Sequence, residues 1–218
     1  MTVTIPDDLA EPSGGRIVLV VMDGLGGLPD PSTGKTELES AALPNLNRIA
    51  ANAALGLHQP VAPGVTPGSG PGHLGLFGYD PVRWNIGRGV LSALGVGFEL
   101  REGDLATRLN FATVDAEGRV TDRRAGRPSD DENKRLVAKL RENVKAPEGA
   151  ELFFESEKEH RAVMILRGSR LRAELEDTDP QDTGVPPLPV KATTPEAKAS
   201  AELVQRVLDA GREALRDE

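Results

Sequence analysis

The stretch that decides the fold is Ile17-Val18-Leu19-Val20-Val21-Met22-Asp23-Gly24, a continuous apolar run that ends in a polar turn. The run is rich in β-branched residues and predicts a strand buried on both faces, as in a parallel α/β sheet. Residues 1–15 before it are polar, and we expect them to form a flexible leader. Asp23 falls at the carboxyl end of the predicted strand, where open α/β sheets bind ligands and where a carboxylate suits a divalent metal. An ordinary Asp-Gly turn explains the same two residues.

A helix and a loop are predicted further along the chain. Residues 44–54 place apolar side chains at helical spacing, with Pro44 suited to the first turn and Gly56 to the stop. Residues 60–72 are dense in proline and glycine. A loop of this composition is costly to order and is often functional.

The pattern changes from about residue 81. Short alternating segments around Ala116-Glu117-Gly118 predict a hairpin, and a charged helix and two further strands follow. This order is typical of a small α+β unit. Residues 176–190 indicate a crossing linker, and residues 195–218 indicate an amphipathic helix. The expected elements of the α+β unit are strands at 105–114, 119–123, 151–155 and 162–166 and a helix at 129–143.

Composition bounds the class of protein. The chain has 218 residues, of which 38% are hydrophobic, so a wholly disordered chain is excluded. It has no cysteine, which excludes disulfides and thiolate metal sites and indicates a reducing compartment. No apolar run is long enough to span a bilayer, and acidic residues stand where a signal peptide needs positive charge. The net charge of −8 argues against nucleic-acid binding. We therefore expect a soluble, cytoplasmic protein with no membrane or nucleic-acid partner.

Two glycine-containing motifs fail as nucleotide sites. Gly34-Lys35-Thr36 resembles the end of a phosphate-binding P-loop, but Pro29 stands where its first glycine is required. Gly24-Leu25-Gly26-Gly27 lacks the third glycine of a dinucleotide loop, which would also fall at Pro29. We predict that Gly34-Lys35-Thr36 belongs to a turn.

Ser69 is the candidate nucleophile. The apolar residues after it predict a helix, so Ser69 lies at a helix N-terminus, where free N–H groups and the helix dipole favour phosphate. Serine at such a position acts as a nucleophile if its pKa is lowered, and otherwise serves as an N-cap. His73 is four residues on and shares a helix face with Ser69, so it either pairs with the serine, lines the site or is structural.

Basic residues form the candidate anion-binding site. Asp122-Arg123-Arg124-Ala125-Gly126-Arg127 closes the second hairpin strand, and its guanidiniums suit bidentate binding of carboxylate or phosphate. His160-Arg161 precedes another strand, and Arg88 stands between glycines that permit close backbone approach. A solvated basic turn is the alternative. Asp177 and Asp179 are either metal ligands or ordinary linker acids.

Several segments together resemble one family. They are VLVVMDGLGGLP (18–29), VAPGVTPGSGPGHLGLFGYDP (61–81), IGRGVLSALGVG (86–97), NFATVDAEGRVTDRRAGR (110–127), EHRAVMILRG (159–168) and DTDP (177–180). In this order they resemble the cofactor-independent (2,3-bisphosphoglycerate-independent) phosphoglycerate mutases of the archaeal type, within the alkaline-phosphatase superfamily. The resemblance covers residues 16–218.

The resemblance implies an α/β fold with a partial alkaline-phosphatase-like core at 16–80 and 181–218 and a smaller α+β substrate domain inserted at 81–180. It implies that Asp23 binds one of two divalent ions, often Mn²⁺ and sometimes Mg²⁺, Co²⁺ or Zn²⁺. It also implies that Ser69 touches the same metal and takes up the phosphoryl group as phosphoserine. The residues that would hold glycerate and phosphate are Asp122, Arg123, Arg124, Arg127, His160 and Arg161.

Two departures from the family pattern matter. Gly70 stands where many relatives carry an acidic residue, which leaves the nucleophile and its loop intact. Family members are also longer, and their remaining metal ligands, an Asp/His set, come from a C-terminal half that this sequence lacks. The second metal site is therefore expected to be incomplete in this chain.

Three functions remain open. The first is a truncated or split phosphoglycerate mutase that is active only with the missing half, supplied as a separate chain. The second is a non-catalytic phosphate-ligand binding protein. The third is another phosphatase or phosphotransferase of the superfamily, or the phosphonopyruvate decarboxylase to which similar sequences are ascribed. In each case we expect exposed apolar surface where strands are lacking, and hence self-association into a homo-oligomer.

Overall fold

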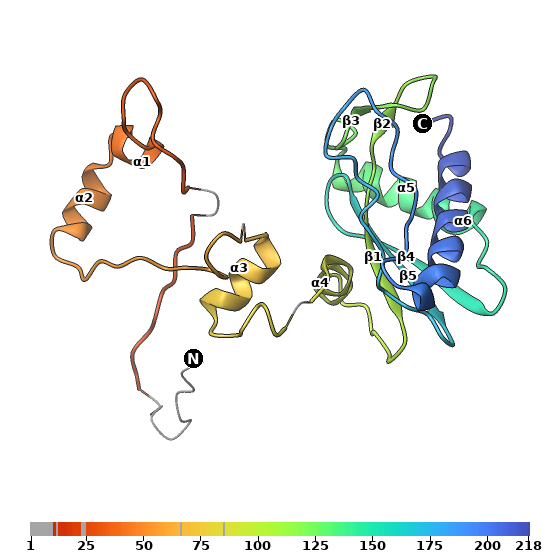
Figure 1. Ribbon diagram of the computed structural model, residues 1–218, viewed down its shortest axis with the longest axis horizontal. Helices are drawn as coiled ribbons and strands as arrows, with labels where there is room; N and C mark the ends of the chain where they lie inside the picture. Colours follow the sequence, from red (N-terminus) through yellow and green to blue (C-terminus); the bar gives the residue numbers. More distant parts are fainter. Residues whose placement is uncertain (1–10, 12, 23–24, 66, 85) are drawn as a thin grey trace. The chain divides into compact units, whose positions relative to one another are not determined.

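The computed structural model describes residues 11, 13–22, 25–65, 67–84 and 86–218 (Figure 1). Its contacts divide the chain into two compact units, Met1–His58 and Gln59–Glu218. Within the described residues both helices and strands occur, so the expected mixed α/β character is confirmed in its coarse form.

The first unit contains two short helices, α1 (Glu37–Ser40) and α2 (Pro44–Ala50). Thr36 caps α1, because its Oγ1 accepts from the Glu39 backbone N–H at 3.2 Å while the Glu39 carboxylate accepts from the Thr36 N–H. The predicted helix after residue 44 is confirmed, although it ends before residue 54. The predicted turn is also confirmed, because Gly34 has a φ of 66° and donates to the Asp30 carbonyl.

The strand expected at 17–22 is not formed, which corrects the sequence-based prediction. Residues 16–22 have no regular secondary structure, and Ile17 and Val20 are 99% and 79% exposed. A parallel strand of this composition is stable only when neighbouring strands satisfy its backbone and cover its side chains. Among the described residues no strand pairs with this segment. The predicted exposed apolar surface is therefore present here.

The second unit is built on a three-stranded antiparallel sheet in the order β1-β5-β4. Its strands are β1 (Leu105–Asn110), β4 (Ala150–Ser156) and the central β5 (Arg161–Gly168). A small ladder of β2 (Thr113–Val114) and β3 (Val120–Asp122) forms the predicted hairpin. Helix α5 (Asp130–Asn143) begins after Ser129, whose Oγ accepts from the Glu132 N–H. The α+β unit expected within 81–180 therefore has the predicted elements.

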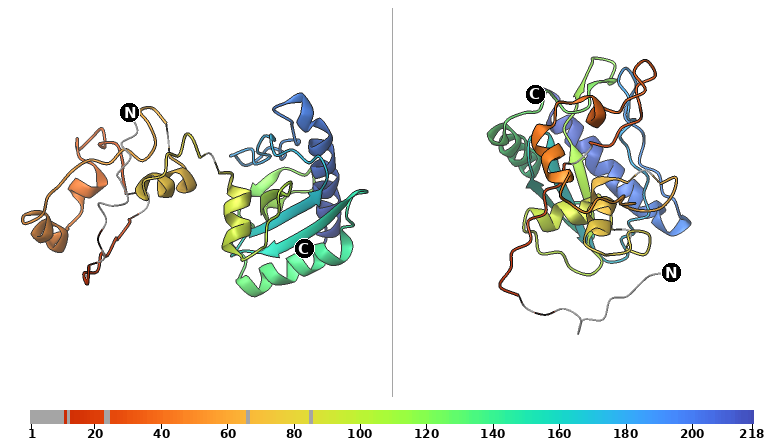
Figure 2. Two further views of the ribbon diagram at one scale, coloured as in Figure 1. Left: turned by 90° about the horizontal axis from the view of Figure 1, so that it is seen from below. Right: turned by 90° about the vertical axis from the view of Figure 1, so that its left-hand side faces the viewer.

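Helices cover both faces of this sheet (Figure 2). Met164 and Leu166 of β5 pack in the core with α5 and α6 (Lys198–Ala214), whereas Val163 and Ile165 pack with Ala93 of α4 (Arg88–Gly95). This alternation follows from the pleat of a central strand. Helix α4 was not predicted from the sequence.

The last helix lies in the same core as the sheet, although residues 181–218 were assigned to the other domain. Val204 and Val207 of α6 pack with Leu105 and Met164. Lys139 of α5 donates to the Asp217 carboxylate at 2.7 Å, which holds the end of the chain against α5. The apolar side chains along one side of α6 pack here, because they cover the apolar surface that α5 and the sheet leave exposed.

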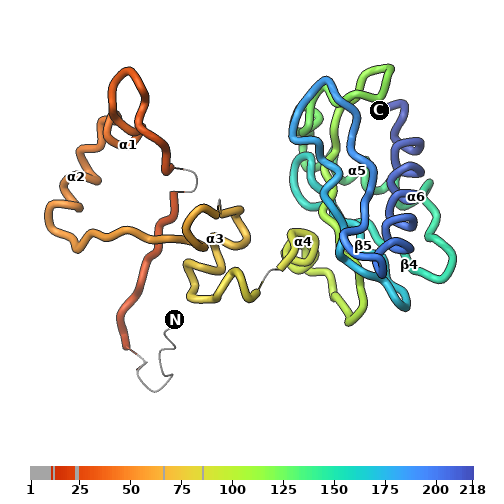
Figure 3. The backbone as a smooth tube through the Cα atoms, in the orientation of Figure 1, coloured from red at the N-terminus to blue at the C-terminus, as the bar shows by residue number. Residues whose placement is uncertain are grey.

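The expected linker at residues 176–190 has no helix or strand (Figure 3). Backbone hydrogen bonds nevertheless join it to other segments. Gly184 donates to the carbonyl of Val120, and Val120 donates to the carbonyl of Val185. Leu175 forms an isolated antiparallel bridge with Ala192. None of the described helices has the length and apolar character needed to cross a membrane.

Removal of the Asp104 carboxylate is expected to destabilise the second unit. Its side chain is 2% exposed and binds the Arg167 guanidinium at 2.9 and 2.7 Å, and that guanidinium lies over the rings of Phe98 and Phe153. Asp104→Ala leaves this largely covered cation without its anion, so the free energy of unfolding should fall by about 2 kcal/mol in urea denaturation. Asp131→Ala, at an exposed ion pair, is the control and should change little. Equal effects of the two substitutions would contradict the prediction.

Candidate anion-binding site

Arginines from three elements meet at one face of the sheet. Arg108 on β1 is paired with Val163 of β5, and Arg161 is paired with Asn110, so Arg108 and Arg161 are diagonal neighbours on the α4 face. Arg88 is the first residue of α4. The next residue, Gly89, lies so close to β1 that an added Cβ would be 2.0 Å from the Ala106 carbonyl oxygen. Glycine thus lets Arg88 approach the strand that carries Arg108.

Arg108 is a candidate site residue that the sequence analysis missed. Burial lowers the pKa of its guanidinium, and the charges of Arg88 and Arg161 lower it further. Within the described part of the chain, the side chains of these three arginines make no hydrogen bond or ion pair with a carboxylate. The only signal for Arg108 in the sequence is the alternation of Leu105–Asn110, which places a cation on a half-buried face. Three neighbouring cations of this kind suit an anionic ligand.

The loop after β3 is shaped by Asp122. Its carboxylate accepts from the backbone N–H groups of Arg124 at 2.7 Å and Gly126 at 2.8 Å, and these hydrogen bonds lower its pKa. Ala125 and Arg127 have φ values of 45° and 56°, a conformation that costs energy outside glycine. In this structure Asp122 therefore orders the loop that presents the arginines, while its role as a direct substrate ligand remains a prediction.

Arg123 is fixed by the linker. Its guanidinium donates to both carboxylate oxygens of Asp179, at 2.9 and 2.7 Å, and to Gln181 at 2.5 Å. These bonds lower the pKa of Asp179, with a smaller contribution from Arg88. The pair joins residues far apart in the sequence, and it gives Asp179 a role as counter-ion to an arginine.

His160 is the most buried member of the predicted set, at 4% exposed. Burial lowers its pKa, and the charges of Arg161, Arg124 and Arg127 act in the same direction. The Glu159 carboxylate is 3.7 Å from Nδ1 and also pairs with Arg127 at 2.9 Å. Nδ1 is buried and has no hydrogen-bond partner among the described residues. An unpaired buried polar atom needs a partner, and a bound ligand or a water would supply one.

The lowered pKa of His160 predicts a pH dependence of stability. Between its folded-state pKa and the ordinary value of 6.5, the unfolded chain binds more protons, so falling pH lowers the free energy of unfolding. The loss of stability begins near the pKa of His160 in the unfolded chain and levels off below its pKa in the folded chain. In urea denaturation between about pH 8 and about pH 5, His160→Gln should lose less stability than the unaltered chain. A parallel decline in both proteins would contradict this assignment.

Ser69 and His73 lie together on α3 (Ser69–Leu76). Ser69 is exposed and is the first residue of the helix, which confirms its predicted place at an N-terminus. His73 Nδ1 lies 2.6 Å from the backbone carbonyl of Ser69 and therefore donates to it. The histidine is thus bound to the serine's main chain and not to its hydroxyl. An added Cβ at Gly70 would lie 2.9 Å from Leu91 Cδ1, so an acidic residue here would require that side chain to move.

The implied metal is not held by the described residues alone. Asp23, its expected ligand, lies outside the described residues. In the described ranges no group of three or more His, Asp or Glu side chains is placed to hold a metal ion.

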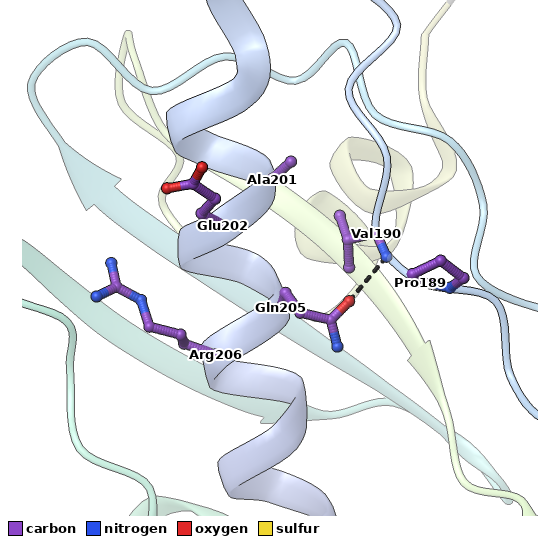
Figure 4. A pocket seen from close by; sticks show the side chains of 6 residues that line it. All are labelled: Pro189, Val190, Ala201, Glu202, Gln205 and Arg206. Carbon is purple, nitrogen blue, oxygen red and sulfur yellow. Dashed lines mark hydrogen bonds between the residues drawn. The ribbon is translucent and has the colours of Figure 1, made fainter.

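A surface hollow in the described structure lies elsewhere (Figure 4). It has a volume of about 530 Å³ along α6, where Gln205 Oε1 accepts from the Val190 N–H at 2.8 Å. None of the predicted site residues lines it. The residues that line it are Pro189, Val190, Ala201, Glu202, Gln205 and Arg206.

The structure is a mixed α/β protein in which arginines gather at one face of a sheet, an arrangement that suits a small phosphorylated or carboxylated anion. Comparison with family models matches residues 50–218 to 2,3-bisphosphoglycerate-independent phosphoglycerate mutase. The chain belongs to this family, as the resemblance of its motifs indicated.

Relatives and solved structures agree with this membership. The chain is 54% identical over 211 residues to a probable 2,3-bisphosphoglycerate-independent phosphoglycerate mutase of Thermus thermophilus, covering 97% of this chain and 52% of the relative. For a protein of the same description in Aquifex aeolicus the identity is 47%, with 97% and 53% covered. A cofactor-independent phosphoglycerate mutase structure from Thermoplasma acidophilum matches with a TM-score of 0.55 and 34% identity, covering 91% and 51%. The chain thus spans about half the length of these relatives.

Proposed function

We propose that this chain is the part of a 2,3-bisphosphoglycerate-independent phosphoglycerate mutase that binds phosphoglycerate and supplies the serine nucleophile. The observation that carries the proposal is the cluster of Arg88, Arg108 and Arg161 beside the buried His160. A substrate with a phosphate at one end and a carboxylate at the other needs several fixed cations, and guanidinium groups bind both anions bidentately.

The proposed reaction interconverts 3-phosphoglycerate and 2-phosphoglycerate. The Ser69 hydroxyl gives up its proton as its oxygen forms a bond to phosphorus, the bond from phosphorus to the substrate oxygen breaks, and the departing oxygen takes up a proton. Phosphoserine and free glycerate result. The arginine cluster holds the glycerate while it re-orients. The other hydroxyl of the glycerate then loses its proton and takes the phosphoryl group back, and the Ser69 oxygen takes up a proton. A divalent ion, Mn²⁺ or else Mg²⁺, Co²⁺ or Zn²⁺, belongs to the proposal because it would lower the pKa of the Ser69 hydroxyl.

The remainder of the relatives' length is the proposed partner of this chain. We place Asp23 and Ser69 in an alkaline-phosphatase-like core that needs further ligands from that remainder, and residues 81–180 in the inserted substrate domain. The exposed apolar run at 17–22 favours such a partner, since it is the segment expected to pair with additional strands. A cytoplasmic location fits a mutase of this class.

Isothermal titration calorimetry of this chain with 3-phosphoglycerate tests the binding half of the proposal. Saturable binding that is tighter than binding of glycerate or inorganic phosphate alone is expected, because two anionic ends engage the cluster together. Binding of phosphate that is as tight as that of 3-phosphoglycerate would favour another phosphatase or phosphotransferase of the superfamily. No binding of 3-phosphoglycerate would count against the proposal.

A non-catalytic binding protein is the second candidate. The observation in its favour is that, in the described ranges, no hydrogen bond or ion pair joins α3 to the arginine cluster. It predicts phosphoglycerate binding without any phosphoryl transfer when the missing half is supplied.

A further inference from the structure

Asn133 is fully buried on α5, and among the described residues its side chain bonds to the end of β4, the start of β5 and the turn between them. Its Nδ2 donates to the carbonyl oxygens of Glu159 at 2.6 Å and Arg161 at 2.8 Å. Its Oδ1 accepts from Ser156 Oγ at 2.5 Å. Both N–H donors and the carbonyl of the amide are therefore used, and the two Nδ2 bonds go to the residues immediately before and after His160.

The position of His160 depends on these backbone bonds, because its ring has few hydrogen bonds of its own. The buried Nδ1 has no hydrogen-bond partner among the described residues, and the His160 carbonyl accepts from the Phe111 N–H at 2.7 Å. The preceding residue, Glu159, has a φ of 52°, which a non-glycine residue adopts only when its surroundings hold it there. The orientation of the imidazole is therefore set by the backbone on either side of it.

We infer that Asn133 is a positioning residue, which fixes the backbone around His160 so that the imidazole and the Arg161 guanidinium are presented to the anion together. The inference rests on the proposed function, because it concerns how that site is held in shape. Asn133 is itself buried, so it acts on the ligand only through His160 and Arg161.

Asn133→Asp tests this role with almost no change of shape. At neutral pH the new carboxylate would oppose the Glu159 and Arg161 carbonyl oxygens, so affinity for 3-phosphoglycerate should fall about tenfold by calorimetry. The His160 ring signals, among only three histidines, should shift in nuclear magnetic resonance spectra. As the pH falls, the deficit relative to the unaltered chain should shrink, because a protonated carboxyl donates one hydrogen bond.

Ser156→Ala is the matched control, because it removes a bond to Oδ1 and leaves both Nδ2 bonds in place; its affinity should stay within about threefold. Should Asn133→Asp not fold, Asn133→Ser replaces it, with one donor kept. Unchanged His160 signals and affinity in a folded Asn133 variant would make Asn133 merely structural and overturn the inference. Failure of the unaltered chain to bind 3-phosphoglycerate would instead contradict the proposed function, while the His160 spectra would still decide the role of Asn133.

Discussion

Substitution of Ser69 by alanine is expected to lower the rate of 3-phosphoglycerate isomerisation at least about a thousandfold, because it removes the oxygen that accepts the phosphoryl group. The assay uses this chain supplied with the remaining half of the Thermus thermophilus relative, as a second polypeptide or fused after residue 218, in the presence of Mn²⁺. Formation of 2-phosphoglycerate is followed in a coupled assay. Binding of 3-phosphoglycerate should change much less than the rate, since the arginine cluster remains.

Ser169→Ala is the matched control for this substitution. Ser169 is an exposed serine in the turn after β5 and has no part in the proposed chemistry. Its rate should equal that of the unaltered protein. A Ser69→Ala protein that retains most of the activity would exclude the phosphoserine route, whatever the strength of substrate binding.

Reversal of charge at Arg161 is expected to weaken 3-phosphoglycerate binding about 100-fold. Arg161→Glu removes a guanidinium from the cluster and sets a carboxylate against the anionic ligand, so attraction becomes repulsion. Calorimetry measures the affinity directly, and the loss should diminish at high salt, because ions screen the exposed part of the interaction.

The control for Arg161→Glu is Arg212→Glu. Arg212 lies on α6, where it pairs with Asp209 at 3.3 Å, so the same change of net charge occurs outside the cluster. Its affinity should fall by less than about threefold. Similar losses in the two variants would mean that overall charge, and not the cluster, governs binding.

Local signals explain why much of the second unit was predictable. Alternation and turn residues mark the hairpin, and Ser129 marks the start of α5, because these elements are stabilised by contacts close in sequence. The strand prediction for residues 17–22 was wrong for the opposite reason. A buried parallel strand depends on neighbouring strands, which are distant in sequence and which the run itself does not specify. Helix α4 was not predicted because glycines flank its first residue, and glycine has a low helix propensity.

The site was predictable in its residue types and not in its pairings. Arg124, Arg127 and His160 stand in conspicuous basic segments, and the structure places both arginines close enough for their charges to act on His160. The role of Asp179 as counter-ion to Arg123 depends on a contact across 56 residues, which no local pattern encodes. Arg108 was missed because a single arginine within a strand resembles any solvent-facing residue until its neighbours are known.

A crystal structure of this chain with 3-phosphoglycerate tests the central claim most directly. The ligand is predicted to lie on the α4 face of the sheet, with its anionic groups at hydrogen-bond distance from the guanidiniums of Arg108 and Arg161 and close to the His160 ring. A ligand bound along α6, or at any site where none of these side chains touches it, would contradict the account.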